Sequence, residues 1–253
     1  MRDLEYVPGG HARNKLDLYL PRPAGAAGGA PLPLVIWVHG GAWLAGSKEG
    51  CGALWLLEKG YAVASINYRL SQHAVFPAQI EDCTAAVRWL RANAATYGLD
   101  PERFGAWGPS AGGHLVALLG TAGEAKESRV QCVVDWFGPT DLAQMRGSHD
   151  EAKSPEALLI GGPIQQNKEK AAKANPIAFV TKDDPPFLIM HGEEDTTVPI
   201  NQSELLHAAL TAAGVPSEFV RIPKSGHGGP GFNTPEVRAK IEAFFDKHLK
   251  KGE

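Results

Sequence analysis

Short apolar runs alternate with amphipathic stretches along most of the chain. Residues 16–20 alternate apolar and polar side chains, which is typical of a half-buried β-strand. Later runs, most of them apolar enough to be buried on both faces, predict strands at residues 34–38, 61–66, 103–107, 130–137 and 186–190. Apolar positions every three or four residues, together with start and stop residues, predict helices at 54–60, 77–97, 111–119, 203–213 and from residue 234.

The alternation of strands and helices from residue 34 onward indicates the fold class. Parallel strands need helical crossovers, so the pattern predicts an α/β protein with a mostly parallel sheet and helices on both faces. Residues 141–182 break the rhythm because they are polar, and they form either a small cap over the working edge of the sheet or a surface excursion. No internal repeat is visible, so we expect one domain over residues 1–253, with a Gly/Pro-rich loop at 24–33.

Composition and charge exclude some classes of binding partner, namely nucleic acids and membranes. Of 253 residues, 43% are hydrophobic and 21% charged, as in an ordinary soluble globular chain. Lys and Arg total 25 against 28 Asp and Glu, which gives a net charge of −3 without a long run of like charge. A nucleic acid or an anionic membrane would require a basic patch, so neither is expected as a partner. The longest clean apolar run, residues 34–38, is far shorter than the roughly 18 residues of a membrane helix.

The cysteines and the N-terminus bear on redox state and compartment. The chain has three cysteines, so at least one of Cys51, Cys83 and Cys132 is free. We interpret all three as buried apolar thiols, with a Cys51–Cys83 disulfide as the alternative. No His/Cys cluster has zinc-site spacing, and no metal is expected. Residues 1–5 lack a signal-peptide apolar stretch, which fits an intracellular protein or a mature secreted one with an added Met; the localisation stays open.

A Gly-x-Ser-x-Gly pattern at residues 108–112 is the first candidate for chemistry. It follows the predicted strand at 103–107 and opens a predicted helix, which is the context of a nucleophile elbow. The serine of such an elbow lies in a strained turn, so its neighbours must be small for strand and helix to pass closely. Ser110 is therefore predicted to be a nucleophile at the carboxyl edge of the sheet.

A serine hydroxyl needs a base that removes its proton. Among nine histidines, His227 lies in a glycine-rich loop between a strand and the last helix, where a loop residue can reach the sheet edge. The other histidines lie in helices, end predicted strands or have no supporting pattern. His227 is therefore the predicted base.

The base in turn needs a carboxylate that fixes its tautomer. The loop after the strand at 186–190 holds Glu193, Glu194 and Asp195, and the two glutamates are interpreted as solvated. Asp195 is the predicted acid, because the order Ser110, Asp195, His227 is that of the α/β-hydrolase triad. Asp141, after the preceding strand, is the competing candidate.

Stabilisation of an oxyanion is the remaining requirement. Small residues in His39-Gly40-Gly41-Ala42-Trp43 follow the strand at 34–38 and can present backbone N–H groups toward the serine. Ala111, directly after Ser110, supplies a further N–H from the elbow.

Taken together, these motifs resemble the α/β-hydrolase superfamily, in the His-Gly-Gly-x-Trp branch related to hormone-sensitive-lipase-like enzymes. Within it the chain is most similar to small bacterial feruloyl/acetyl-xylan-type carboxylesterases. The resemblance implies a Ser110, Asp195 and His227 triad, an oxyanion hole at Gly41, Ala42 and Ala111, and neither metal nor organic cofactor. The chain departs from the family's pattern at two positions. Ala42 stands where the lipase-like His-Gly-Gly-Gly motif has its third glycine, and Pro109 stands where an acidic residue often precedes the serine.

The predicted function is hydrolysis of short-chain acyl or aryl (feruloyl/acetyl-type) esters by a serine carboxylesterase, through an acyl-enzyme. Kynurenine formamidases share the His-Gly-Gly-x-Trp motif, so arylformamidase activity is an alternative. A peptidase and a non-catalytic binding protein on the same fold are weaker alternatives. The expected partner is a small-molecule ester, with the oligomeric state open. Four aromatic residues flank the motifs and are candidate substrate contacts: Trp43, Trp136, Phe137 and Phe232.

Overall fold

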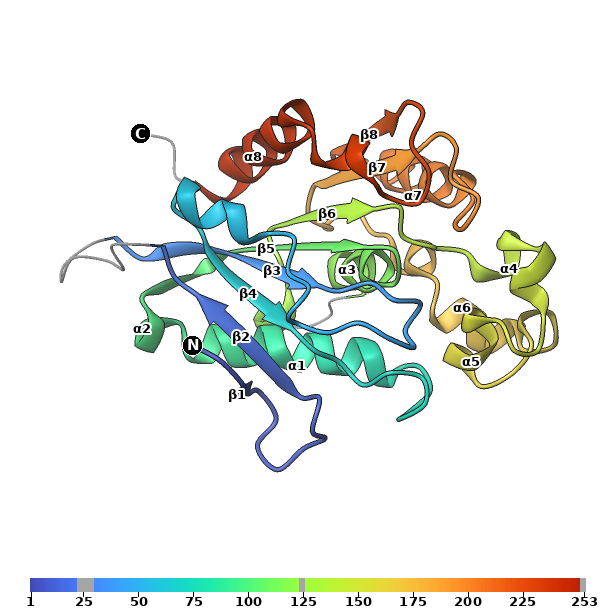
Figure 1. Ribbon diagram of the computed structural model, residues 1–253, viewed down its shortest axis with the longest axis horizontal. Coiled ribbons are helices and arrows are strands. Elements are labelled where there is room, and N and C mark those ends of the chain that lie inside the picture. Colours follow the sequence, from blue (N-terminus) through green and yellow to red (C-terminus); the bar gives the residue numbers. More distant parts are fainter. Residues whose placement is uncertain (22–29, 123–125, 251–253) are drawn as a thin grey trace.

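One eight-stranded sheet, in the order β1-β2-β4-β3-β5-β6-β7-β8, runs through the computed structural model (Figure 1), which describes residues 1–21, 30–122 and 126–250. β1 and β2 pair antiparallel, as do β2 and β4, and all other neighbouring strands are parallel. The sheet confirms the α/β class. The strands are β1 Leu4–Glu5, β2 Lys15–Tyr19, β3 Leu32–Val38, β4 Ala62–Ile66, β5 Leu99–Pro109, β6 Cys132–Trp136, β7 Phe187–Gly192 and β8 Ser217–Ile222.

Helices cover both faces of this sheet, as the sequence predicts. The α-helices are α1 Ala78–Ala92, α2 Ala94–Tyr97, α3 Ala111–Thr121, α4 Leu142–Met145, α5 Pro155–Ile160, α6 Lys168–Lys173, α7 Asn201–Ala212 and α8 Pro235–Leu249. The 3₁₀ helices are η1 Leu54–Lys59, η2 Lys126–Ser128, η3 Gly147–Asp150, η4 Ile164–Gln166, η5 Pro176–Phe179 and η6 Pro230–Asn233. Buried side chains of α1, α3 and α7 form one core cluster, and those of η1 and α8 form a second.

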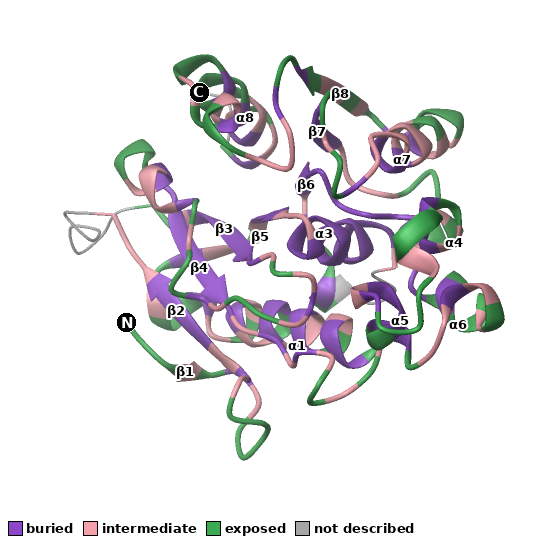
Figure 2. Cartoon of the chain, turned by 45° about the vertical axis from the view of Figure 1, so that its right-hand side comes forward, coloured by how far each residue is buried: buried purple, intermediate pink, exposed green. Residues whose placement is uncertain are grey.

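The central strands are buried on both sides because each core cluster packs against one face. All residues of β4 and β6 are buried, and the α3 side chains are buried all round (Figure 2). A helix that is apolar all round belongs in an interior. The elbow that precedes α3 is therefore held between two packed layers.

Several predicted elements differ from the structure in their bounds; the strand predicted at 103–107, for example, extends over Leu99–Pro109. The helix predicted at 77–97 is interrupted at Asn93, so that α1 and α2 are separate. The segment at 54–60 is a 3₁₀ helix, which ends where Gly60 takes the left-handed conformation. β3 begins at Leu32, inside the predicted loop at 24–33; residues 22–29 of that loop lie outside the described residues. The short strand β1 has too few residues for a periodic signal.

The polar segment 141–182 folds into six short helices, from α4 to η5, beyond the carboxyl ends of the parallel strands (Figure 1). Side-chain caps begin some of these helices. Asp141 accepts a hydrogen bond from the Ala143 N–H at the start of α4, and Ser154 accepts one from the Ala157 N–H at the start of α5. Caps of this kind stabilise the first turn of a short helix that has no long hydrophobic stripe.

The three cysteines are free thiols, so the alternative Cys51–Cys83 disulfide is wrong. Cys83 lies in the core cluster beneath α1 and α3, whereas Cys51 packs against the cluster on the opposite face. The sheet separates the two sulfur atoms. Within residues 1–21, 30–122 and 126–250, no helix combines the length and apolarity that crossing a membrane requires.

Candidate active site

Ser110 lies at the turn between β5 and α3, with φ 54° and ψ −121°. This backbone conformation is strained for a residue with a side chain. Glycines make the turn sterically feasible. A Cβ on Gly108 would lie 2.6 Å from the backbone of Gly112, and one on Gly112 would collide with the Val38 carbonyl oxygen. The sequence motif thus builds a strained turn that presents the Ser110 hydroxyl at the carboxyl edge of the sheet.

His227, on the loop after β8, contacts the Ser110 hydroxyl. Its Nε2 lies 2.8 Å from Ser110 Oγ, although 117 residues separate the two in sequence. The Phe137 ring packs on the imidazole with 4.6 Å between centroids. The imidazole is therefore held in place by an aromatic contact while its nitrogen meets the serine.

Asp195, on the loop after β7, meets the other side of this imidazole. Its Oδ2 lies 2.7 Å from His227 Nδ1, and its side chain is fully buried. Its Oδ1 accepts hydrogen bonds from the Thr197 and Val198 N–H groups at 2.8 and 2.9 Å. Burial would raise the pKa of this carboxyl, but hydrogen bonds from His191, His227 and the Val198 N–H outweigh burial and hold the pKa below its ordinary value. Asp195 is an anion that only accepts hydrogen bonds.

His191 is a further neighbour of Asp195 that sequence reasoning missed. Its Nε2 lies 3.3 Å from Asp195 Oδ2 and 2.9 Å from the Val198 carbonyl oxygen, and its Nδ1 lies 2.7 Å from Ser203 Oγ. Two acceptors at Nε2 place the proton there, so that Ser203 donates to Nδ1. The only sequence signal is a histidine at the end of a buried strand, four residues before the acid.

The loop at residues 39–43 packs against the elbow. A Cβ on Gly40 would lie 2.8 Å from the Pro109 carbonyl oxygen. Within the described residues, the N–H groups of Gly41, Ala42 and Ala111 donate to no backbone acceptor. Ala111 opens α3, where an N–H has no intrahelical partner. These three N–H groups are available to an anionic oxygen beside Ser110.

His39 fixes the shape of that loop. Its ring is buried and stacks on Tyr68 at 4.4 Å, with Nδ1 2.7 Å from the Gly40 carbonyl oxygen and Nε2 3.1 Å from an Arg13 nitrogen. Arg13 only donates, so the ring is neutral with its proton on Nδ1. Burial lowers the pKa of His39 to about 4, which keeps this tautomer at neutral pH.

A cavity of about 320 Å³ contains the Ser110 hydroxyl. The loop residues Ala42 and Trp43 form part of its wall, and residues from η3 to the start of α5 form another part, so the segment 141–182 contributes to the lining of the cavity. Of the four aromatic residues predicted to contact substrate, Trp43 lines this cavity. Trp136, Phe137 and Phe232 do not line it; they pack together in a core cluster beneath His227.

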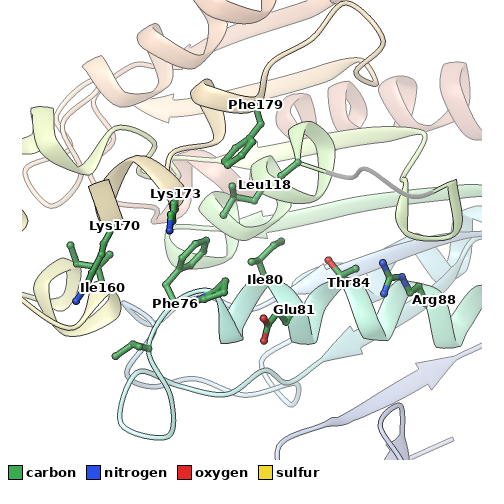
Figure 3. A pocket seen from close by; sticks show the side chains of 13 residues that line it. Phe76, Ile80, Glu81, Thr84, Arg88, Leu118, Ile160, Lys170, Lys173 and Phe179 are labelled. Carbon is green, nitrogen blue, oxygen red and sulfur yellow. The ribbon is translucent and has the colours of Figure 1, made fainter. Parts of the chain in front are cut away.

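A second cavity, of about 550 Å³, lies between α1, the C-terminal end of α3 and the segment from α5 to η5 (Figure 3). Phe76, Ile80 and Leu118 provide apolar walls, and Lys170 and Lys173 lie at one end. It contains neither Ser110 nor His227, so its larger volume does not make it the candidate site.

The competing acids lie elsewhere. Asp141 caps α4 and also accepts a hydrogen bond from Gln144 Nε2 at 2.6 Å, so both of its oxygens are engaged away from the imidazole. Glu193 and Glu194 are exposed, in agreement with their interpretation as solvated charges. Within residues 1–21, 30–122 and 126–250, no group of three or more His, Cys, Asp or Glu side chains is arranged to hold a metal ion.

Asp135, on β6 directly behind the elbow, is a buried acid without a role in this arrangement. Its Oδ1 accepts the Gly138 N–H at 2.9 Å, and its Oδ2 has no partner within the described residues. Burial raises the pKa of this carboxyl to about 6, although the Gly138 N–H opposes the shift. The folded state therefore favours the protonated form, and the corresponding stability is fully present below the ordinary Asp pKa and is lost as pH rises through 6.

We therefore expect Asp135→Asn to gain stability relative to the parent chain as pH rises from 4.5 to 8, by about 2 kcal/mol. The amide keeps the acceptor for Gly138 and cannot ionise. Urea unfolding of both proteins at several pH values measures the difference. A difference that is constant over this range would show that Asp135 does not titrate near pH 6.

Comparisons with known proteins show the family of this chain. The model of the family described as BD-FAE matches residues 16–210. The esterase LipQ of Mycobacterium tuberculosis is 33% identical over 96% of this chain, which spans 61% of LipQ; the chain spans about half to three-fifths of the curated relatives it matches best.

Two solved structures are also similar over nearly the whole chain. A truncated carbohydrate esterase from gut microbiota has a TM-score of 0.89 at 35% identity, covering 99% of this chain and 96% of that one. A bifunctional GH43-CE protein of Bacteroides eggerthii has a TM-score of 0.91 at 38% identity, covering 98% of this chain and 35% of that one.

Proposed function

The chain belongs to the BD-FAE family, an α/β-hydrolase family, and from this premise we propose that it is a serine carboxylesterase. The observation that carries the proposal is the continuous chain of hydrogen bonds from Ser110 Oγ through His227 to Asp195, at 2.8 and 2.7 Å. The named esterases among its relatives support the same reaction class.

In the first half of the reaction, Ser110 Oγ attacks the ester carbonyl while His227 Nε2 accepts its proton. Asp195 accepts the hydrogen bond from His227 Nδ1, so that Nε2 is the free base in the neutral ring. The charge that forms on the carbonyl oxygen is stabilised by the N–H groups of Gly41, Ala42 and Ala111. These donors are fixed by the loop and helix before the substrate arrives, so they need no reorganisation in the transition state.

In the second half, the protonated imidazole donates to the leaving alcohol oxygen, which leaves the acyl group on Ser110. Water then attacks the acyl carbon while His227 again accepts a proton. The bond between the acyl carbon and Ser110 Oγ then breaks, His227 returns its proton to Oγ, and the carboxylic acid departs.

The substrate class follows from the cavity. A volume of about 320 Å³ beneath a polar segment fits a small acyl group, attached to an alcohol that tolerates polar surroundings. Acetyl and similar short esters of carbohydrates meet both conditions, and a carbohydrate esterase is among the structural relatives. The relatives' names support this class without extending to a particular polysaccharide.

A substrate panel tests the proposal. We expect turnover of p-nitrophenyl acetate and acetylated sugars, and little or no turnover of aminoacyl anilides. N-formylkynurenine is included because the same machinery could hydrolyse a formamide. Efficient hydrolysis of N-formylkynurenine with no hydrolysis of esters would replace esterase by arylformamidase.

We expect the rate to fall as the acyl chain lengthens beyond about four carbons. An apolar tunnel would contribute about 0.8 kcal/mol per buried methylene, but a cavity of about 320 Å³ has little room for a long acyl chain beside the alcohol. The measurement is kcat/KM for p-nitrophenyl esters from acetate to decanoate. A maximum at ten carbons or more would contradict the inference from the small volume of the cavity.

A further inference from the structure

A histidine and a glutamate contact each other in the wall of the cavity that contains Ser110. Both His149, on η3, and Glu156, on α5, line the cavity that contains Ser110. His149 Nδ1 lies 3.0 Å from Glu156 Oε1, and the Glu156 side chain is only 6% exposed. A carboxylate so deeply buried beside a reactive serine is a feature of functional sites rather than of surfaces.

The backbone around this pair is fixed as well. Ser154 Oγ donates to the His149 carbonyl oxygen at 2.8 Å and accepts the Ala157 N–H at 3.1 Å. The imidazole is thus held at its backbone by Ser154 and at its ring by Glu156. The ring is therefore held in one orientation, and one of its two nitrogen atoms has no hydrogen-bond partner in the described residues.

That atom is Nε2. Because the carboxylate of Glu156 only accepts, the His149 proton lies on Nδ1 and the neutral ring offers Nε2 as an acceptor. Within the described residues, Nε2 makes no hydrogen bond, and Glu156 Oε2 is buried without a partner. His149 Nε2 is not one of the buried unpartnered side-chain atoms of the described residues, so it is accessible, and a ligand group in the cavity can hydrogen-bond to it.

We propose that His149, oriented by Glu156, forms a binding subsite for the leaving alcohol, in which Nε2 accepts a hydrogen bond from a hydroxyl group next to the ester. The inference rests on the proposed esterase function. A short acyl group carries no polar atom beyond its carbonyl oxygen, which the N–H groups near Ala42 and Ala111 take. The hydroxyl must therefore belong to the alcohol. His149 and Glu156 are positioning residues that select hydroxylated alcohols, and the chemical step remains with Ser110 and His227.

Two esters of matched size test the subsite: glycerol monoacetate and propyl acetate, which share the acyl group and the three-carbon alcohol skeleton but differ in hydroxyl groups. His149→Asn keeps an N–H for Glu156 and removes Nε2. We expect it to raise KM for glycerol monoacetate about tenfold, the scale of one hydrogen bond, with kcat and the hydrolysis of propyl acetate nearly unchanged.

Two variants of Glu156 show whether its acceptor oxygen, which orients the His149 ring, or its negative charge is needed for binding. Glu156→Leu removes the acceptor that orients the ring and should match His149→Asn, whereas Glu156→Gln keeps an acceptor oxygen and should restore most of the affinity. Glu169→Gln is the control, because Glu169 is an exposed acid on α6 in the same segment and does not line this cavity. Thermal unfolding checks that each variant is folded.

The outcomes distinguish failure of the alcohol subsite from failure of the proposed esterase function. Equal losses on both esters, or no loss on either, would overturn the subsite while the esterase proposal stands. A parent chain that hydrolyses neither ester, nor p-nitrophenyl acetate, would instead overturn the esterase function. Loss confined to glycerol monoacetate and appearing in KM supports the subsite, because a merely structural role for His149 would affect both esters alike.

Discussion

Replacement of Ser110 by alanine should reduce ester turnover by about 10⁴-fold or more while leaving the fold intact. Ser110 Oγ is the atom that forms the acyl bond, and within the described residues its one hydrogen bond joins it to His227. Removing it shortens a side chain at the wall of a cavity and leaves no buried group unpaired. The measurement is kcat/KM for p-nitrophenyl acetate alongside the thermal unfolding midpoint.

A covalent probe provides the control for Ser110→Ala. A fluorophosphonate should modify the parent chain once, at Ser110, and should leave the alanine variant unmodified, as peptide mass spectrometry would show. Modification of any other residue in step with loss of activity would assign the nucleophile elsewhere. An unfolding midpoint much lower in the variant would mean that the lost turnover reflects lost structure.

The main features of the site could be predicted from sequence because each rests on local steric requirements. Gly108 and Gly112 are needed wherever a strand and a helix meet at a strained serine, so their spacing carries the geometry of the elbow with it. The order of the strands along the chain then predicts which loops meet at the carboxyl edge. In the same way, the alternation of strands and helices along the chain was enough to predict a mostly parallel sheet.

Contacts that depend on how an irregular loop or a pair of short helices folds could not be predicted, even between residues close in sequence. The hydrogen bond between His191 and Asp195 depends on how the loop after β7 folds back, and the sequence shows only a histidine at a strand end. The His149–Glu156 pair depends on the packing of two short helices in a polar segment with no periodic signal. Trp136 and Phe232 flank motifs in sequence but pack beneath His227, because large aromatic side chains also fill cores.

The second large expected effect is the loss of turnover in Asp195→Asn, and it follows from the hydrogen bonds that the Asp195 carboxylate accepts. Every contact of the carboxylate is an N–H donor: Thr197 and Val198 at Oδ1, and His191 and His227 at Oδ2. Asparagine has one acceptor oxygen and one NH₂ group. The backbone N–H groups cannot change their role, so the amide oxygen must take the place of Oδ1 and the NH₂ group the place of Oδ2.

The NH₂ group at that place faces His227 Nδ1, which must then become an acceptor. The imidazole proton moves to Nε2, the nitrogen that faces Ser110, and the ring can no longer accept the serine proton. We expect kcat to fall by about 10⁴-fold with the fold preserved. Glu193→Gln and Glu194→Gln, at exposed positions of the same loop, should change kcat by about twofold at most, within the small range of surface substitutions. Retention of turnover in Asp195→Asn together with its loss in Asp141→Asn would transfer the acid to the other loop, against the hydrogen bonds that Asp141 makes at the start of α4.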